Sequence, residues 1–255
     1  MSGWTALLLA GSRPGIDPFA AAHDTDLKAL IPICGLPMVS RPVAALLAAP
    51  EIDFIRVLTQ HPERIAAVLP SDPHLSVEAS GGTIAATLEA ALNDPATRFP
   101  LLVTTADHAL LDPAMIADFC ARANGADLAI GVVERRPLMK RLPQTKRTWI
   151  RFRGGAYSGA NLFAFESAKA LKAVELWRSV EQDRKKGWRV VAALGPLVLL
   201  GTVLRVLSLD QALAAVGHRL GLGVRKVEMA NPLAAVDVDK PSDHELVTAI
   251  LEGRA

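Results

Sequence analysis

Short apolar runs alternate with amphipathic stretches through the first half of the chain. Runs of roughly four to eight apolar residues that end in glycine, proline or polar residues are typical of buried strands. The pattern predicts strands over residues 6–10, 52–59, 75–79, 100–105 and 127–133. Helical spacing of apolar residues, with proline near a start or glycine after an end, predicts helices over residues 38–49, 62–69, 83–92 and 113–124.

Strands that alternate with helices in this way predict an α/β fold, in which a mostly parallel central sheet carries helices on both faces. Such sheets bind their ligands at the carboxyl ends of the strands, so the loops that follow the strands are candidate sites. The loop after residues 6–10 holds Gly11 and Ser12, and the loop after residues 100–105 holds Asp107.

The second half of the chain is less regular. Residues 134–153 are basic, contain two prolines and are predicted to form a loop. Strands are predicted over residues 160–165, 224–228 and 235–239, and helices over residues 167–186 and 242–251. Ser242, with Glu245 three residues later, matches a capping box at the start of the last helix. No internal repeat or long polar linker divides the sequence, and we expect a single domain over residues 1–255.

The composition removes several classes of protein. The 255 residues are 51% hydrophobic and carry 28 Lys and Arg against 26 Asp and Glu. This balance excludes intrinsic disorder and does not suit a nucleic-acid-binding domain, so no nucleic-acid partner is expected. Two cysteines exclude a disulfide scaffold, and Cys34 and Cys120 are predicted to be small core residues. The first residues do not match a signal peptide, which predicts a cytoplasmic protein.

The first candidate for chemistry is the segment Leu-Ala-Gly-Ser-Arg at residues 9–13, after the first predicted strand. A glycine there lets backbone N–H groups approach an anionic phosphate, and Arg13 and Lys28 would neutralise its charge. The alternative is an ordinary strand-to-helix turn. The sequence contains neither the Walker A pattern nor the dinucleotide-binding glycine pattern.

Carboxylates stand at the ends of two predicted strands. Asp107 follows residues 100–105, while Asp237 and Asp239 lie two residues apart, a spacing that puts both on one side of a strand. Mg²⁺ prefers oxygen ligands and is typically held by one or two carboxylates together with substrate phosphates. The alternative is that these aspartates cap the turn or helix that follows.

Two further segments suit the recognition of anions. Residues 80–83, Ser-Gly-Gly-Thr, precede a predicted helix, and such small residues let a base or ribose lie against the backbone. The alternative, a tight turn with an N-cap, is compatible with that role. A basic tract then leads to Tyr157 and Asn161, and its arginines would offer a bidentate fork to an acceptor phosphate. Such charge runs also occur on solvated surfaces. The cations of the tract are Lys140, Arg141, Lys146, Arg147, Arg151 and Arg153.

Residues 9–13, followed by Lys-Ala-Leu-Ile-Pro-Ile-Cys-Gly-Leu-Pro-Met from Lys28, resemble the N-terminal signature of the MobA-like nucleoside-triphosphate transferases. The resemblance continues at Ser-Gly-Gly-Thr from Ser80, at Ala-Asp-His from Ala106 and at Val-Asp-Val-Asp-Lys-Pro-Ser-Asp from Val236. It implies one Rossmann-like GT-A nucleotidyltransferase domain. Its nucleotide-binding half would be residues 1–133. Its acceptor-binding half would be residues 134–255, with an apolar helical insertion over about 167–222. An insertion over residues 16–25 departs from the family's compact glycine loop.

The same resemblance implies roles for individual residues. Arg13 and Lys28 would be catalytic, while Asp107 and Asp239 would bind Mg²⁺, with Asp237 as the alternative second ligand. The predicted nucleotide contacts are Leu9, Ala10, Gly11, Ser12, Gly81, Gly82, Thr83 and Ala106. The predicted acceptor contacts are Arg147, Tyr157 and Asn161.

The implied activity is the transfer of a nucleoside monophosphate from a nucleoside triphosphate to a small phosphorylated acceptor, with release of pyrophosphate. CTP is the favoured donor, by resemblance to cytidylyltransferases that act on alcohol phosphates. The alternatives are a guanylyl or cytidylyl transfer to a molybdenum cofactor, a GT-A glycosyltransferase that uses a sugar nucleotide, and a non-catalytic protein that has kept the fold.

One segment does not fit a plain α/β enzyme. Residues 190–207 are almost entirely apolar and follow the basic segment Arg-Lys-Lys-Gly-Trp-Arg at residues 184–189. Gly195, Pro196 and Arg205 interrupt it, which argues against a membrane span. The segment is predicted to be a buried helix hairpin, a dimer or partner surface, or an interfacial helix that makes peripheral membrane contact.

Overall fold

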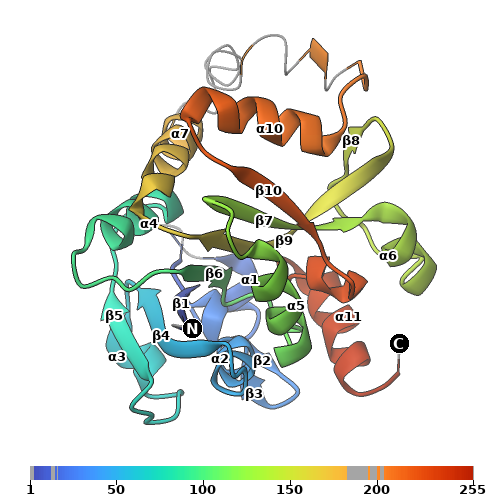
Figure 1. The fold of residues 1–255 in the computed structure, drawn as a ribbon. Coiled ribbons are helices and arrows are strands. Elements are labelled where there is room, and N and C mark those ends of the chain that lie inside the picture. The colour runs from blue at the N-terminus through green and yellow to red at the C-terminus, as the bar shows by residue number, and fades with distance from the viewer. Residues whose placement is uncertain are drawn as a thin grey trace.

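The computed structural model describes residues 3–12, 15, 17–182, 195, 200–201 and 204–254. Eight strands of this described part form one twisted sheet, in the order β10-β7-β9-β6-β1-β4-β5, with β8 paired to β9 at one end (Figure 1). Their bounds are β1 (Trp4–Leu9), β4 (Ile52–Thr59), β5 (Leu75–Ala79), β6 (Leu101–Thr105), β7 (Leu128–Glu134), β8 (Ile150–Phe152), β9 (Gly155–Phe165) and β10 (Val224–Glu228).

The sheet is mostly parallel, as the sequence predicts. β1 lies at its centre and pairs in parallel with β4 and β6, while β9 runs antiparallel between β6 and β7. All six residues of β1 are buried, which explains why this strand reads as a continuous apolar run rather than an alternating one.

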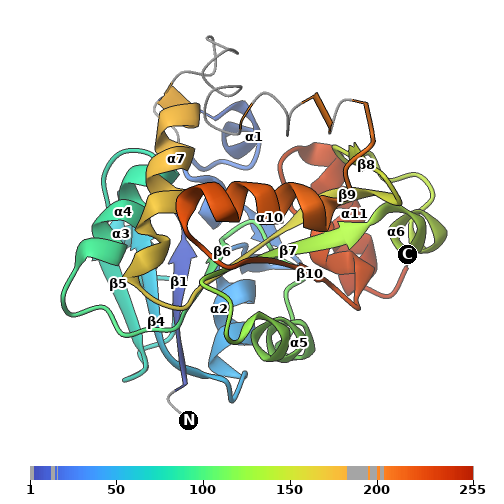
Figure 2. The same ribbon diagram turned by 45° about the horizontal axis from the view of Figure 1, so that its top comes forward.

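Helices cover both faces of the sheet (Figures 1 and 2). Ala6 and Leu8 of β1 pack in one apolar cluster with α2 (Ser40–Leu47) and α5 (Pro113–Ala123). Leu7 and Leu9, which point the other way, pack in a second cluster with α4 (Ile84–Asn93) and α7 (Leu171–Gln182). The other elements are α1 (Pro18–Ala21), α3 (Pro62–Ala66), α6 (Arg135–Arg141), α10 (Leu209–Leu220), α11 (Pro241–Leu251), the strands β2 (Pro32–Ile33) and β3 (Leu36–Pro37), and the 3₁₀ turns Lys28–Leu30, Ala168–Ala170 and Pro232–Ala235.

Three predictions of secondary structure are wrong. The predicted loop over residues 134–153 contains α6 and β8, because the Glu134 side chain caps α6 and Leu138 anchors it in the core. Residues 235–239 do not form a strand. Val236 and Val238 are fully buried there, and this burial rather than strand pairing produces the alternation. The last helix begins at Pro241 with Lys240 as its N-cap, so Ser242 is not the cap.

The two cysteines differ from each other. Cys120 lies in the core, as predicted, and burial raises the pKa of its thiol to about 12. Cys34 is exposed at the turn between β2 and β3, so its predicted place in the core is wrong. Cys34 has a φ of +49° and lies in a turn that faces solvent. Its apolar neighbours flank that turn, so they do not indicate burial of Cys34 itself.

Two sequence predictions fall outside the described residues. One concerns Arg13, and the other concerns most of the apolar segment 190–207, of which only residues 195, 200–201 and 204–207 are described. Among the described helices, none has both the length and the apolar character that crossing a membrane requires.

Candidate active site at the carboxyl ends of the central strands

The loops that follow β1, β4 and β6 are held side by side. The Ala10 N–H donates to the Leu58 carbonyl at 2.9 Å, and the Ala106 N–H donates to the Leu9 carbonyl at 3.0 Å. These bonds continue the parallel pairing one residue past the strands. Five of the predicted nucleotide contacts therefore meet at one edge of the sheet: Leu9, Ala10, Gly11, Ser12 and Ala106.

Gln60, which directly follows β4, is a residue of this sheet edge that the sequence reasoning missed. Its Oε1 accepts from the Ser12 N–H at 2.8 Å, and its amide lies so close to Gly11 that a Cβ there would be 2.9 Å from Nε2. The contact fixes the loop after β1 against the end of β4. Its position directly after a predicted strand is the signal that could have identified it.

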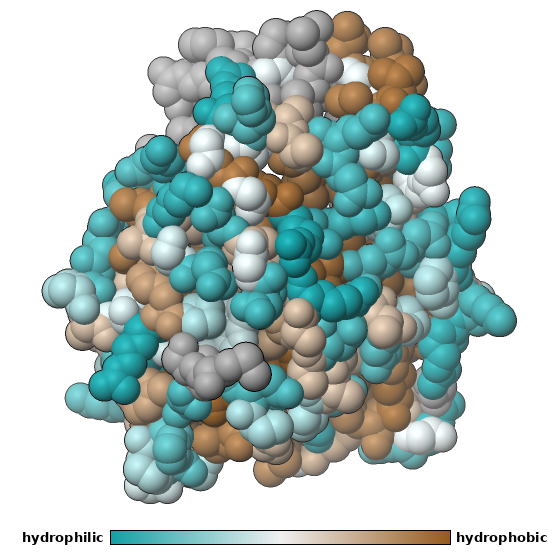
Figure 3. Space-filling model, viewed as in Figure 1, coloured by the Kyte–Doolittle hydropathy of each residue, from teal (hydrophilic) through white to brown (hydrophobic). Residues whose placement is uncertain are grey.

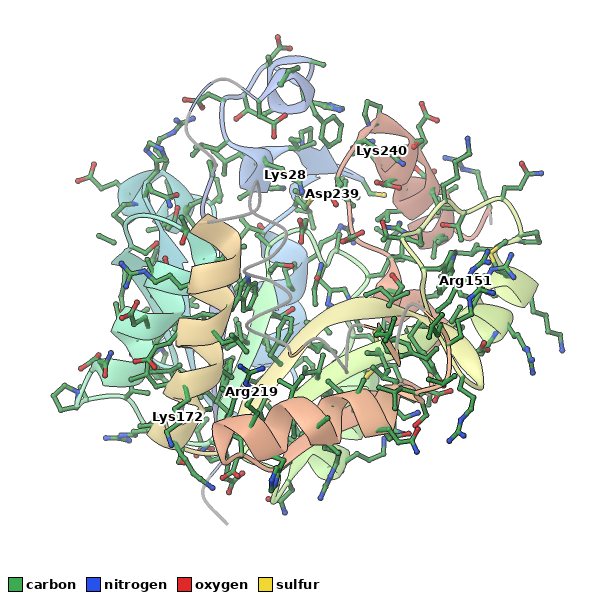
Figure 4. The ribbon with its side chains drawn as sticks, turned by 90° about the horizontal axis from the view of Figure 1, so that it is seen from above. Lys28, Arg151, Lys172, Arg219, Asp239 and Lys240 are labelled. Carbon is green, nitrogen blue, oxygen red and sulfur yellow. The ribbon has the colours of Figure 1, made fainter. Side chains whose placement is uncertain are left out.

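Lys28, Asp107 and Asp239 come together although they lie far apart in the sequence. The Lys28 Nζ donates to Asp107 Oδ2 at 2.7 Å and to Asp239 Oδ1 at 2.5 Å, and Figure 4 shows Lys28 and Asp239 next to each other. Three of the predicted catalytic and metal-binding residues thus form one group, which we call the Lys28 cluster.

The Lys28 cluster is open to solvent on one side. The side chains of Lys28 and Asp107 are 23% and 20% exposed, whereas that of Asp239 is 62% exposed. Burial lowers the pKa of Lys28, but the charges of the two carboxylates outweigh it and raise that pKa above its ordinary value. Lys28 therefore stays charged at neutral pH. The Thr105 hydroxyl donates to Asp107 Oδ1 at 2.5 Å and holds this carboxylate in place.

The donor set fits a hard divalent cation. One oxygen of Asp107 and one of Asp239 converge on a single positively charged nitrogen, so the pair can share a cation. Within the described residues, no group of three or more His, Cys, Asp and Glu side chains lies close enough to hold a metal by itself. Two carboxylates with the remaining ligands left to water and phosphate is the arrangement that Mg²⁺ prefers.

Asp237 pairs with Arg147 rather than with Lys28. Its Oδ1 accepts from Arg147 Nη1 and its Oδ2 accepts from the Asn161 amide at 3.1 Å. Arg147 also donates through Nη2 to Asp243 Oδ1 at 3.4 Å, and Asp243 Oδ2 accepts from the Asp239 N–H at 3.2 Å. We call these four side chains, Arg147, Asn161, Asp237 and Asp243, the Arg147 cluster.

The Arg147 cluster lies deeper than the Lys28 cluster. The side chains of Arg147 and Asp243 are 7% and 8% exposed. Burial and the neighbouring charge of Asp239 raise the pKa of Asp237, and the guanidinium of Arg147 opposes that shift. Asp243, whose importance the sequence did not reveal, links the two clusters because it binds Arg147 and the Asp239 backbone together.

Asn161 reaches Asp237 through an irregularity in the sheet. The pairing of β7 with β9 shifts register between Ile130 and Val132, which is a β-bulge, and Asn161 in this bulge has a φ of +50°. Asparagine tolerates the left-handed region better than most residues. The bulge aims the Asn161 amide at Asp237 and away from the regular pleat.

Tyr157, the third predicted acceptor residue, has other neighbours. Its ring lies 6.3 Å from that of Phe152, and the Lys226 Nζ lies 4.9 Å above it. The structure therefore brings Arg147 and Asn161 together through Asp237, while Tyr157 lies in a separate group with Phe152 and Lys226.

The loop after β5 is shaped by its glycines and by a cap. The Ser80 N–H donates to the Thr59 carbonyl at 2.7 Å, and Gly82 has a φ of +83°, which favours glycine. The Thr83 hydroxyl accepts from the Ala86 N–H at 3.3 Å and caps α4. The turn-and-cap interpretation of Gly81, Gly82 and Thr83 is thus confirmed, and their nucleotide contact stays a prediction.

The described part of the insertion, residues 17–25, packs against α11. Asp17 caps α1, and the Phe19 ring lies 5.2 Å from His23 and 6.2 Å from His244 in edge contacts. The His244 Nε2 lies 2.7 Å from the Pro32 carbonyl. These contacts join the chain before and after Lys28 to the first turns of α11, the helix that follows Asp239.

Comparisons with known proteins agree with the fold described above. Residues 11–197 match the family described as the MobA-like NTP transferase domain. A hypothetical transferase from Thermus thermophilus is 30% identical, with a TM-score of 0.80 over 95% of this chain and 100% of the other.

Two structures of lower identity share the fold. A 4-diphosphocytidyl-2C-methyl-D-erythritol synthase from Anaerococcus prevotii is 10% identical, with a TM-score of 0.62 over 98% of this chain and 96% of the other. Another synthase of this name is 14% identical, with a TM-score of 0.58 over 98% and 100%. No curated protein matches the sequence.

Proposed function

Since the chain belongs to the family of MobA-like NTP transferase domains, we propose that it is a Mg²⁺-dependent nucleotidyltransferase. Its reaction would transfer CMP from CTP to a small phosphorylated acceptor and release pyrophosphate. The observation that carries the proposal is the Lys28 cluster, because it places one ammonium and two carboxylates together where the central strands end. Ligands of parallel sheets bind at this edge.

The proposed reaction requires the protein to position the two substrates and to neutralise the charge on their phosphates. An oxygen of the acceptor phosphate forms a bond to the α-phosphorus, the bond from that phosphorus to the bridging oxygen breaks, and pyrophosphate leaves with the electron pair. The attacking oxygen is already anionic, so no general base is required. Lys28 would neutralise charge that develops on the phosphates, and Arg13 is assigned the same role from the sequence.

Asp107 and Asp239 are the residues that would hold Mg²⁺. The ion supplies charge neutralisation and orientation of the phosphate oxygens when it is bound. Lys28 already pairs with both carboxylates, so it would exchange these contacts for phosphate oxygens when the substrate arrives. The exposed side of Asp239 is compatible with this exchange.

The remaining assignments concern the base and the acceptor. The backbone at Gly81, Gly82 and Thr83 would lie against the base, and Asn161 and Tyr157 would lie on the acceptor side. Arg147 would act there by holding Asp237 and Asp243 rather than through a free guanidinium. The choice of CTP rests on the sequence resemblance, and the names of two structures that share the fold agree with it.

The direct test is pyrophosphate release by the full chain, with each of the four ribonucleoside triphosphates, Mg²⁺ and a panel of sugar, alcohol and pterin phosphates. We expect release with CTP and one acceptor class. Binding of no triphosphate in a thermal-shift assay with Mg²⁺ would contradict the proposal. Turnover of a sugar nucleotide in place of a triphosphate would assign the protein to the glycosyltransferases instead.

Lys28→Ala tests the site within that assay. We expect kcat/KM to fall by about 10²–10³-fold, the range found when one preorganised charge-stabilising donor is removed. Lys172→Ala, on the exposed surface of α7, is the matched control and should keep full activity (Figure 4). Full turnover by Lys28→Ala would show that the site is wrongly assigned even if the reaction is right.

A further inference from the structure

Four large apolar side chains are exposed on two neighbouring segments. Ile150 lies on β8, and Leu200, Leu204 and Val206 lie just before α10; each is more than half exposed. Figure 3 shows hydrophobic surface gathered at the top of the molecule, over the segment that precedes α10. Single exposed apolar side chains are ordinary, but a group of four is a feature that needs an explanation.

Two hydrogen bonds join the two segments into one surface. The Arg153 N–H donates to the Leu207 carbonyl at 2.8 Å, and Arg153 Nη2 donates to Gln211 Oε1 at 3.2 Å. The Leu204 N–H donates to the Leu200 carbonyl at 2.9 Å, which closes a turn. We call this surface the β8 tip. It consists of Ile150, Arg151, Leu200, Leu204, Arg205 and Val206.

The chain around the β8 tip is rich in cations. Residues 134–159, which lead into and out of β8, contain eight Lys and Arg, of which Arg147 is buried in the Arg147 cluster, and one acidic residue. Residues 200–220 contain two Arg and one Asp. The cations alternate with the apolar side chains, as in Ile150-Arg151 and Leu204-Arg205-Val206. Figure 4 shows Arg151 at the side of the molecule, away from Lys28 and Asp239.

We propose that the β8 tip binds the surface of an anionic lipid bilayer. Aliphatic side chains would enter the boundary between headgroups and acyl chains, and each nearby Arg or Lys would add attraction to anionic headgroups. The described helices include none that could span a membrane, so the contact would be peripheral. The inference does not depend on the nucleotidyl transfer proposed above.

Two other partners fit the tip less well. A second copy of the chain that docked through the same patch would bring its arginines against their own counterparts, and this like-charge contact opposes association. A nucleic acid would favour the cations, but it gains little from four exposed aliphatic side chains, which cannot stack on bases as aromatic rings do. The combination of aliphatic and cationic side chains favours the lipid surface.

The test is co-sedimentation of the full chain with vesicles of phosphatidylcholine alone or mixed with phosphatidylglycerol. We expect binding to the anionic vesicles, weakened by salt, and little binding to the neutral ones. Leu204→Asp should reduce the partition coefficient by about tenfold or more, because it places a charge where an apolar side chain enters the bilayer. Arg151→Glu should reduce it by a similar factor.

Val68→Asp is the matched control, because Val68 is exposed after α3, far from β8 in the fold. It should bind vesicles as the unchanged protein does, and circular dichroism should show that all three variants are folded. Equal binding to neutral and anionic vesicles, no binding to either, or full binding by Leu204→Asp would overturn the proposal. A concentration-dependent dimer that Leu204→Asp abolishes would assign the tip to a second copy and would also overturn it.

Discussion

Two aspartates that are separated by one residue have opposite surroundings. Asp239 is largely exposed and pairs with Lys28, while Asp237 is partly buried and pairs with Arg147 and Asn161. Val238 anchors the chain between them, because its side chain is fully buried and its N–H donates to the Asp107 carbonyl at 3.0 Å. The Lys28 cluster and the Arg147 cluster are therefore neighbours along the chain with different cations.

This difference suggests different roles for the two clusters: the Lys28 cluster would bind substrate and metal, and the Arg147 cluster would stabilise the fold around it. Within the Lys28 cluster, Asp239 is the carboxylate that is open to water, and an exposed ion pair contributes about 0–1 kcal/mol to stability. Under the proposed function, the exchange of the Lys28–Asp239 contact for a metal or a phosphate would therefore cost little. Breaking a buried pair by removing one partner costs several kcal/mol, because the other charge is left without compensation. The Arg147 cluster would thus hold the chain in the position from which Asp239 reaches Lys28.

The largest expected effect comes from removing the cation of the deeper cluster. Arg147→Met should lower the free energy of unfolding by about 3–5 kcal/mol, because the carboxylates of Asp237 and Asp243 then lose their shared guanidinium. Urea denaturation measures the change. Lys146→Met, at the exposed neighbouring position, is the control and should stay within about 0.5 kcal/mol of the unchanged protein.

The loss in Arg147→Met should also depend on pH. A carboxyl whose pKa is raised in the folded state contributes stability below its ordinary value of 3.8 and loses it as pH rises through the folded pKa. Burial already raises the pKa of Asp237, and removal of the opposing Arg147 charge would raise it further. The difference between variant and unchanged protein should therefore widen as the pH rises above 3.8. A constant difference would contradict this account.

The same substitution at the two aspartates should give opposite results. Asp239→Asn should lower kcat/KM by about 10²-fold or more and leave the unfolding free energy within about 0.5 kcal/mol. Asp237→Asn should lower the unfolding free energy by about 1–3 kcal/mol, because asparagine has one acceptor oxygen for two donors, and either Arg147 or Asn161 then faces its NH2 group. It should lower kcat/KM by less than about tenfold.

Pyrophosphate release and urea denaturation of the two variants measure both quantities on one pair of proteins. Equal losses of activity would mean that Asp237 also reaches the reacting phosphates. Equal losses of stability would mean that the Lys28 cluster supports the fold as much as the Arg147 cluster does. Either result would remove the distinction between the two clusters.

The sheet and most of its helices are predictable from the sequence. The central strands β1 and β6 are buried on both faces and read as continuous apolar runs. The less buried strands Ile52–Thr59 and Leu75–Ala79 carry polar residues among the apolar ones, and their predicted bounds still match the observed strands at both ends. Lys28, Asp107 and Asp239 were also predicted, from the family resemblance, and the structure brings them into one cluster. Ligand positions at strand ends follow from the topology, so the location of the site follows too.

The Arg147 cluster and the irregular segment around Asp237 could not be predicted, because they depend on contacts between residues that are distant in the sequence. The alternation of Asp237 and Asp239 looks like a strand, but the buried Val236 and Val238 produce it in an irregular segment. Arg147 belongs to a run of cations that would suit a solvated face, and only its distant partners Asp237 and Asp243 make it a buried residue. Such pairings join residues about a hundred positions apart, and neither spacing nor composition reveals them.

The smallest expected effect concerns Asn161, whose amide extends the Arg147 cluster. Asn161→Ala loses the hydrogen bond to Asp237 and leaves alanine at a φ of +50°, without the short polar side chain that lets asparagine adopt this region. We expect a loss of about 2 kcal/mol in the free energy of unfolding, of which about 1 kcal/mol is the hydrogen bond and about 1 kcal/mol is the backbone conformation.

Asn161→Gly separates these two contributions. Glycine adopts the left-handed region freely, so this variant loses the hydrogen bond but not the conformation, and it should be about 1 kcal/mol more stable than Asn161→Ala. Urea denaturation of both variants against the unchanged protein measures the difference. If the two variants are equally stable, the bulge relaxes when the amide is removed. The left-handed backbone is then a consequence of the bond to Asp237 and does not aim the amide at it.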